Sequence, residues 1–258
     1  MNLFTEDHAF VTGQRKVEIS ESLQPERSYN GSLNFNQIYT IGKSQGSLDV
    51  DGFYTYFTNK IIPNYNEPQK IIYANTQGHA ISKGIGISMN HHFVFPLSFN
   101  LGINYQQVEE VSINEDGRKS VHPLAYAPKW SGVGSANYEW QKPKLTLAYT
   151  MRYTGAMALP EVFDLDDTGN PLPVARPTVS MPFSFHNLQI TKAFCKNTWQ
   201  VYAGLQNILN YRQPISPLVG YNDPNAAKGF SPFFDTAYAY SPLHGRELYV
   251  GVRWRARD

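Results

Sequence analysis

The sequence lacks several features that mark common classes of protein. It has no run of about 18 apolar residues, so it contains no membrane-spanning helix. Cys195 is the single cysteine, which excludes an internal disulfide framework and a cysteine-based zinc site. The net charge is only +1 and no block of Lys and Arg occurs, so nucleic acid is not an expected partner.

Motifs of catalysis and cofactor binding are also missing. The sequence has no nucleophile elbow, no phosphate-binding loop and no dinucleotide fingerprint, so we predict no enzyme activity and no cofactor. The first residues lack the positive start and the apolar core of a signal peptide. This indicates either a cytoplasmic protein or a missing N-terminus, and the strand pattern of the remaining chain favours the second.

The sequence does contain a regular alternation of apolar and polar residues. Aromatic residues make up 14% of the chain although its mean hydropathy is -0.40, because Asn, Gln, Ser and Thr are interleaved with them. In one run Ile85, Ile87 and Met89 alternate with Gly86 and Ser88. This period of two predicts strands with one face for lipid and one for water. About nine strands are expected, over residues 28–41, 47–59, 80–93, 97–108, 130–140, 145–154, 183–194, 198–208 and 246–254.

Short and long connections alternate between these strands. The short ones cover residues 42–46, 94–96, 141–143 and 195–197, and the long ones 60–79, 109–129, 155–182 and 209–245. Short turns on one side and long loops on the other are typical of bacterial outer-membrane barrels, whose long loops are extracellular. The predicted fold is therefore all-β, an antiparallel transmembrane β-barrel segment. A large soluble β-sandwich or propeller is the alternative, although loops of this length are unusual in compact domains.

An odd number of strands has a structural consequence. Bacterial single-chain barrels have even numbers of strands, and an open sheet in lipid would leave unpaired backbone groups at its edges. We therefore expect the chain to be a fragment whose missing strands precede Met1. Residues 1–24 are expected to form an extracellular loop segment, and residues 25–258 the C-terminal portion of the barrel.

Aromatic residues near the strand ends predict two interfacial belts. Trp140 and Trp199 lie near short turns, and Tyr153 and Tyr211 lie near long loops. Rings at these depths fit the aromatic girdles that flank the apolar band of a membrane barrel.

Two segments invite a metal-binding interpretation that we do not favour. The acidic run at residues 164–170 has Ala175 where an EF-type loop requires its final Glu, so a solvated hairpin tip is preferred. His91 and His92 are neighbours in a predicted strand and point to opposite faces, so they do not chelate together. We predict no metal site.

Local sequences at the strand ends resemble motifs of TonB-dependent outer-membrane receptors. Residues 23–30 resemble the L-x-P-E-x-S-x-N motif, residues 204–210 the G-x-x-N-L-F-N motif, and residues 240–246 the Y-x-P-x-x-G-R motif that precedes the terminal strand. Residues 4–15 are similar to an extracellular loop of Bacteroidetes-type members. The residues that carry the three motifs and the terminal strand are Pro25, Glu26, Ser28, Asn207, Asn210, Gly245, Arg246 and Trp254.

Each motif residue also has a local structural role. Pro25 lacks an N–H and suits the loop before a strand, where no ladder bond is needed. Gly245 allows a tight return from the last loop. Asn207 and Asn210 can bond backbone groups where a strand becomes a loop. A structural role is therefore favoured over ligand binding for these residues.

The resemblance implies a whole protein larger than this chain. It implies a barrel of about 22 strands in the bacterial outer membrane, occluded by an N-terminal plug and surrounded by lipid. A TonB complex would act through the missing N-terminal part, and the cargo would be a ferric siderophore or cobalamin. A passive porin-like barrel or an adhesin is the alternative function, and an outer-membrane hydrolase is the least favoured one.

Two sets of residues are candidates for contacts with plug and cargo. Four charged residues on the polar side of the predicted strands are expected to include plug contacts. They are Asp49, Asp51, Glu139 and Arg253. The loop aromatics that form candidate substrate contacts are Tyr211, Tyr221, Phe230, Phe233 and Phe234. Packing of the loops on one another explains these aromatics equally well.

Overall fold

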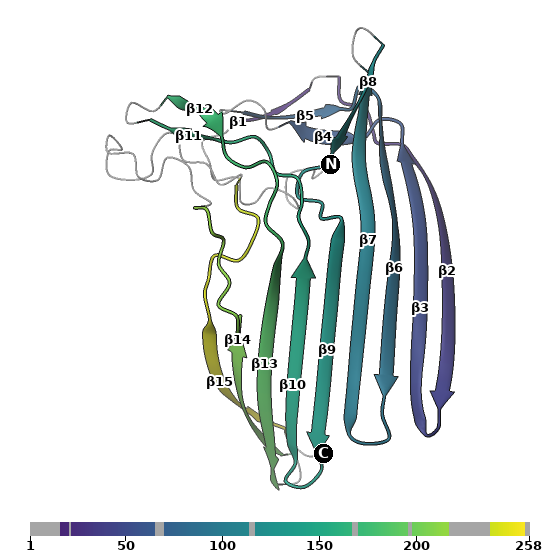
Figure 1. The fold of residues 1–258 in the computed structure, drawn as a ribbon, viewed down its shortest axis with the longest axis vertical. Helices are drawn as coiled ribbons and strands as arrows, with labels where there is room; N and C mark the ends of the chain where they lie inside the picture. Colours follow the sequence, from purple (N-terminus) through teal and green to yellow (C-terminus); the bar gives the residue numbers. More distant parts are fainter. Residues whose placement is uncertain are drawn as a thin grey trace.

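One curved antiparallel sheet forms most of the computed structural model, which describes residues 16–20, 22–64, 70–113, 117–166, 170–195, 198–216 and 238–255. Its long strands are β2 (Ser28–Ile41), β3 (Ser44–Phe57), β6 (His79–His92), β7 (Leu97–Ile113), β9 (Trp130–Trp140), β10 (Leu145–Thr154), β13 (Phe183–Phe194), β14 (Trp199–Gln206) and β15 (Glu247–Trp254). They lie side by side in chain order, from β15 at one edge to β2 at the other (Figure 1). The all-β antiparallel fold is confirmed.

The observed strands match the predicted ones closely, with two differences of physical interest. β3 begins at Ser44 rather than at residue 47, because Gly42 adopts a φ of 63° and closes a tighter turn than expected. β7 continues to Ile113 rather than ending at residue 108, because it pairs there with β8 (Lys119–Pro123). Both connections are therefore shorter than the sequence suggested.

The strand register assigns each side chain of the sheet to one of two faces. Val50 pairs with Ile87 and Ile87 with Ile103, which places three apolar side chains on one face. Asn100 and Ser135 pair on the opposite face. We call the first the apolar face and the second the polar face.

The apolar face has no covering layer in the described part of the chain. Ile87 and Ile103 keep 48% and 49% of their surface exposed, and Leu33 and Val250 keep 79% and 69%. A soluble sandwich would bury these side chains against a second sheet, so that alternative does not fit. An exposed apolar band of this extent requires lipid instead.

Asparagine side chains link neighbouring strands across the polar face. The amide groups donate to hydroxyl or carboxylate oxygens on the adjacent strand, joining Asn30 to Thr55, Asn34 to Asp51, Asn36 to Asp49, Asn90 to Ser47, Asn100 to Ser135 and Asn187 to Thr150. Such cross-strand pairs stabilise the sheet while keeping the face wettable. The predicted plug contacts Asp49 and Asp51 thus already accept one hydrogen bond each.

The main sheet is open at both edges. β2 and β15 each pair with a strand on one side only among the described elements. The outer backbone groups of these two strands are therefore left for partners beyond the described sheet. No helix in the same residues is long and apolar enough to cross a membrane.

Aromatic rings gather at both ends of the apolar face. Near the short turns, Tyr138 and Trp140 lie 4.4 Å apart between ring centroids, and Trp199 and Trp254 lie 6.4 Å apart. Near the long loops, Trp130 lies 4.8 Å from Tyr105. Trp140 and Trp199 are 39% and 45% exposed, as rings at a lipid–water boundary require.

His91 and His92 occupy opposite faces of β6, as the alternation of side chains along a strand requires. His91 is 7% exposed and shares a hydrogen bond of 3.1 Å with the Tyr39 hydroxyl, while His92 is exposed. Neither residue belongs to a metal-binding cluster of His, Cys, Asp and Glu among the described residues.

The long loops contain short strands that the sequence pattern did not predict. β1 (Lys16–Ile19), β5 (Lys70–Asn75) and β4 (Ile61–Asn64) form a three-stranded sheet, and β11 (Phe163–Leu165) and β12 (Pro171–Ala175) form a hairpin. Both lie at the loop end of the main sheet (Figure 1). The acidic run after Phe163 thus belongs to a hairpin, although residues 167–169 lie outside the described chain.

Candidate functional site

The turn after β14 is organised by a fully buried asparagine. Asn207 is 0% exposed and has a φ of 49°, in the left-handed region that asparagine tolerates. Its Oδ1 accepts the Tyr211 N–H at 2.9 Å, and its Nδ2 donates to the carbonyl oxygens of Tyr211 and His244 at 2.8 and 3.1 Å. Its own N–H donates to Asn187 Oδ1. One side chain therefore ties the start of the last loop to its end.

A second asparagine, Asn210, also links the start of the last loop to its end. Asn210, with a φ of 54°, accepts the Arg246 N–H at 2.9 Å, and the Arg246 guanidinium donates to the Ile208 carbonyl. A Cβ on Gly245 would lie 2.7 Å from Asn210 Oδ1 and would displace this link and the nearby Arg212 side chain. The two C-terminal motif segments meet here in space.

The first motif organises the start of β2. Asn59 donates to the Pro25 carbonyl oxygen, and Glu26 Oε1 accepts the Ile61 N–H at 2.8 Å. Ser28 opens β2 opposite Phe57. These contacts hold the start of the β3–β6 connection against the segment that precedes β2.

Beside this frame, two long loops share a small core. Met157, Leu159, Val162 and Tyr238 are all buried, with Tyr238 only 1% exposed. The first three come from the β10–β13 loop and Tyr238 from the β14–β15 loop. Tyr238 also donates its hydroxyl to the Pro177 carbonyl oxygen at 2.8 Å. The pKa of Tyr238 is raised, chiefly because burial disfavours the phenolate, so the hydroxyl stays protonated at neutral pH.

Arg176 joins the same two loops electrostatically. Its side chain is 8% exposed, pairs with Asp164 at 2.5 Å, and donates to the Ser216 carbonyl oxygen at 2.5 Å. Its guanidinium carbon also lies 5.1 Å from the centre of the Tyr238 ring. We call this group of contacts the loop clasp.

We predict that Arg176→Met loosens the loop clasp without unfolding the barrel. The ion pair is half exposed on its Asp164 side, so the expected loss is about 1–2 kcal/mol of local stability. Limited proteolysis of the whole receptor should cut these two loops about tenfold faster. Arg118→Met is the matched control, because exposed Arg118 makes no hydrogen bond or ion pair within the described residues. Equal cleavage of both variants would contradict the clasp.

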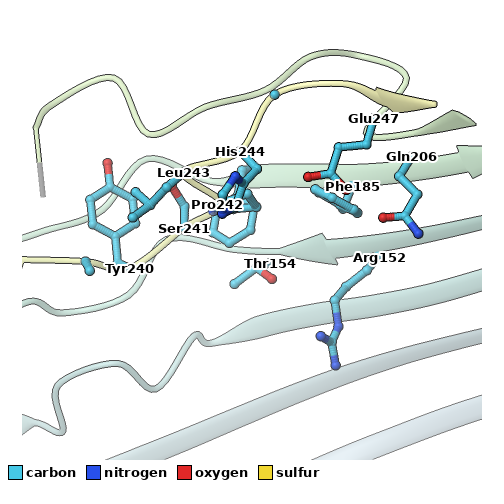
Figure 2. A pocket seen from close by; sticks show the side chains of 13 residues that line it. Arg152, Thr154, Phe185, Gln206, Tyr240, Ser241, Pro242, Leu243, His244 and Glu247 are labelled. Carbon is cyan, nitrogen blue, oxygen red and sulfur yellow. The ribbon is translucent and has the colours of Figure 1, made fainter. Parts of the chain in front are cut away.

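A cavity of 660 Å³ lies on the polar face beneath the last loop. Phe183 and Phe185 of β13, Gln206 and Glu247 of the last two strands, and the segment 239–245 line it, and Figure 2 shows these side chains converging from several strands and the loop. An apolar hollow with a few polar groups is the usual form of a small-molecule site. The hydroxyl of Ser241 is buried at its wall and has no hydrogen-bond partner in the part of the chain that the structure describes.

The sequence-predicted loop aromatics are only partly placed by the structure. Tyr211 stacks on Phe183 with centroids 5.4 Å apart, and its buried hydroxyl has no hydrogen-bond partner among the described residues. The other four, Tyr221, Phe230, Phe233 and Phe234, lie outside the described residues. Sequence reasoning did not single out the cavity residues Arg152, Gln206 and Glu247, although alternation placed them on the polar side of their strands. It also missed Phe185, which the register with Arg152 places on that face.

Comparison with known proteins identifies the fold family. The sequence model described as "TonB dependent receptor-like, beta-barrel" matches residues 4–208. The chain belongs to this family. No curated protein sequence matches the chain.

Solved structures with the fold of this TonB-dependent receptor segment are distant in sequence. The FrpB iron transporter from Neisseria meningitidis has a TM-score of 0.57 at 15% identity, over 92% of this chain and 32% of the other. The ferripyoverdine receptor of the outer membrane of Pseudomonas aeruginosa has a TM-score of 0.58 at 14% identity, over 90% and 27%. The copper transporter OprC has a TM-score of 0.57 at 16% identity, over 90% and 30%. The chain thus spans about a third of the length of the first of these structures.

Membership of the TonB-dependent receptor family fixes the environment of both faces. The protein lies in the bacterial outer membrane, so the apolar face contacts lipid and the polar face lines the lumen. The loop clasp and the cavity lie at the long-loop end, which is extracellular in such barrels. The cavity therefore opens toward the outer mouth of the lumen.

Proposed function

We propose that residues 25–258 are the C-terminal part of the barrel of an active-import receptor, with residues 1–24 as an extracellular loop segment. The imported nutrient is a scarce metal chelate such as a ferric siderophore, or cobalamin. The barrel supplies the passage, a plug outside this chain supplies the gate, and the TonB complex delivers energy from the inner membrane. No catalytic step is assigned to the protein.

The observation that carries this proposal is the two-faced open sheet. A lumen-facing polar wall and a lipid-facing apolar wall are built side by side, and both edges are left for further strands. In a closed barrel of the family type, further strands pair with the backbone groups at both edges. This pairing is needed because unpaired backbone groups are costly in lipid. The lumen it encloses is too large for side chains alone to fill, which is why a plug is needed.

The relatives support a metal-containing cargo. The three structures named above are an iron transporter, a ferripyoverdine receptor and a copper transporter. The cavity beneath the last loop supports cargo capture at the same end, because aromatic walls with few polar groups suit a bulky chelate.

We predict that uptake by the whole receptor requires TonB. Deleting the gene should abolish accumulation of one radiolabelled chelate or of labelled cobalamin under starvation, and the full-length gene should restore it. Removing TonB should reduce accumulation to the level of the deletion strain, because passage through a plugged barrel needs energy. Accumulation that persists without TonB would instead favour a passive porin, and no change on gene deletion would reject transport.

A further inference from the structure

A second hollow, of 420 Å³, lies on the polar face next to the cavity beneath the last loop. Arg152 and Phe185 line both, so the two hollows adjoin. The second hollow is lined by a row of cross-strand partners on four strands, from Asn100 through Ser135 and Thr150 to Asn187. None of these residues has a role in the contacts described for the last loop except Asn187.

The hydroxyls of this row each have a proton available to donate. Ser135 Oγ accepts the Asn100 amide at 3.0 Å, and Thr150 Oγ1 accepts the Asn187 amide at 3.2 Å. With an acceptor position already used, each hydroxyl keeps its proton for a partner in the lumen. Ser135 and Thr150 are direct cross-strand partners, so their two O–H groups lie close together.

Arg152 adds a cation to the same hollow. It follows Thr150 by two residues on the same face of β10, and its cross-strand partners are Val133 and Phe185, which are apolar. Its guanidinium makes no ion pair or hydrogen bond within the described residues. In Figure 2 the Arg152 side chain points away from Glu247 and His244.

We propose that Arg152, Ser135 and Thr150 form a binding site for an oxyanion, most simply a carboxylate. All three present hydrogen-bond donors toward one hollow, and a planar guanidinium pairs with a carboxylate through two parallel bonds. Two groups of the same chemistry could supply the oxyanion. One is an acidic side chain of the plug, and the other is an anionic oxygen group of the imported substrate. The second source rests on the proposed function, and the first does not.

A solvated arginine is the simplest competing explanation. It predicts no partner for the two hydroxyls and no effect of removing them. The oxyanion site predicts that the two hydroxyls and the guanidinium bind the same ligand. Single variants of Arg152, Ser135 and Thr150 therefore distinguish the two explanations.

The test uses the purified full-length receptor and citrate as the probe. Arg152→Gln should weaken citrate binding about tenfold to a hundredfold, and Ser135→Ala or Thr150→Val about three- to tenfold. Arg152→Lys keeps the charge and should retain part of the affinity. Arg118→Gln is the matched control, because exposed Arg118 precedes β8 in a long loop and makes no hydrogen bond or ion pair within the described residues. Sucrose, which carries no charge, should not compete with citrate.

The second arm addresses the plug as the source. If a plug carboxylate already fills the site, the native receptor binds no citrate, and Arg152→Gln should open the plug at lower urea, measured as conductance in planar bilayers. Loss of citrate binding in Arg152→Gln supports the site and identifies the substrate as the source of the anion. Plug opening promoted by Arg152→Gln but not by Arg118→Gln supports the site and identifies the plug as the source. Neither effect, in variants that still show the heat-modifiable band of a folded barrel, overturns it. TonB-dependent uptake is measured separately, so failure of the proposed function and failure of this site are distinguishable.

Discussion

Replacing Asn207 with alanine is expected to destabilise the receptor by about 3–5 kcal/mol. The substitution removes the acceptor of the Tyr211 N–H and the donor for the carbonyls of Tyr211 and His244, all at a position with no exposure to water. Alanine would also have to adopt a φ of 49°, which costs about 1–2 kcal/mol for a residue other than Gly or Asn. We expect a lower urea midpoint for the whole receptor and less folded barrel in the outer membrane.

Two further variants separate the causes of this loss. Asn207→Gly removes the hydrogen bonds but accepts the positive φ, so it should recover part of the stability. Asn104→Ala changes the same residue type inside β7, where the side chain has no hydrogen bond in the described chain, and should alter stability by less than about 0.5 kcal/mol. If Asn207→Ala unfolds at the same urea concentration as Asn104→Ala, the buried amide is not what holds the last loop.

The main sheet could be predicted from the sequence because lipid and water impose a strict alternation. Ile85, Ile87 and Met89 must face lipid. A shift of the strand register by one residue would turn their polar neighbours to the lipid instead. The strand starts and ends were harder to predict. β7 passes its expected end because β8 continues the pairing, and nothing in the local composition of residues 109–113 marks that contact.

The loops were predictable only where a single residue determines the backbone. Asn207 and Asn210 were expected to bond backbone groups, and the structure shows both doing so. The short strands β1, β4 and β5 were not expected, because strands of four to six residues without alternation carry no period. The pairing of β1 with β5 also depends on contacts between segments more than 50 residues apart, such as Ile19 with Tyr73.

The proposed oxyanion site could not be read from the sequence for a related reason. Arg152, Ser135 and Thr150 are spread over two strands, and Asn100 and Asn187 over two more. Each is an ordinary polar-face residue in its own strand, and only the register across the sheet brings them to one hollow. The register depends on where each turn begins and ends, and the sequence predicted these positions only to within a few residues.

Gly84→Ala is expected to be the second most damaging substitution. The added Cβ would lie 2.6 Å from the Tyr105 carbonyl oxygen and 2.8 Å from Cε1 of Phe53, on the polar face of β6. The carbonyl belongs to the backbone of β7, which the ladders to β6 and β9 hold in place, so it cannot withdraw as a side chain would. Overpacking of this kind costs about 1–3 kcal/mol. Urea unfolding of the full-length receptor, followed by the heat-modifiable band on a gel, measures it.

Gly52→Ala is the matched control because it lies on the neighbouring strand β3 and its added Cβ meets nothing within 4 Å. It should unfold within about 0.5 kcal/mol of the native receptor, or slightly later because alanine restricts the unfolded chain. Combining Gly84→Ala with Phe53→Ala removes the ring but leaves the Tyr105 carbonyl in place, so recovery should be incomplete. Full recovery in the double variant would mean that the ring alone opposes the methyl group, and that the β6–β7 spacing adjusts more readily than a paired ladder should allow.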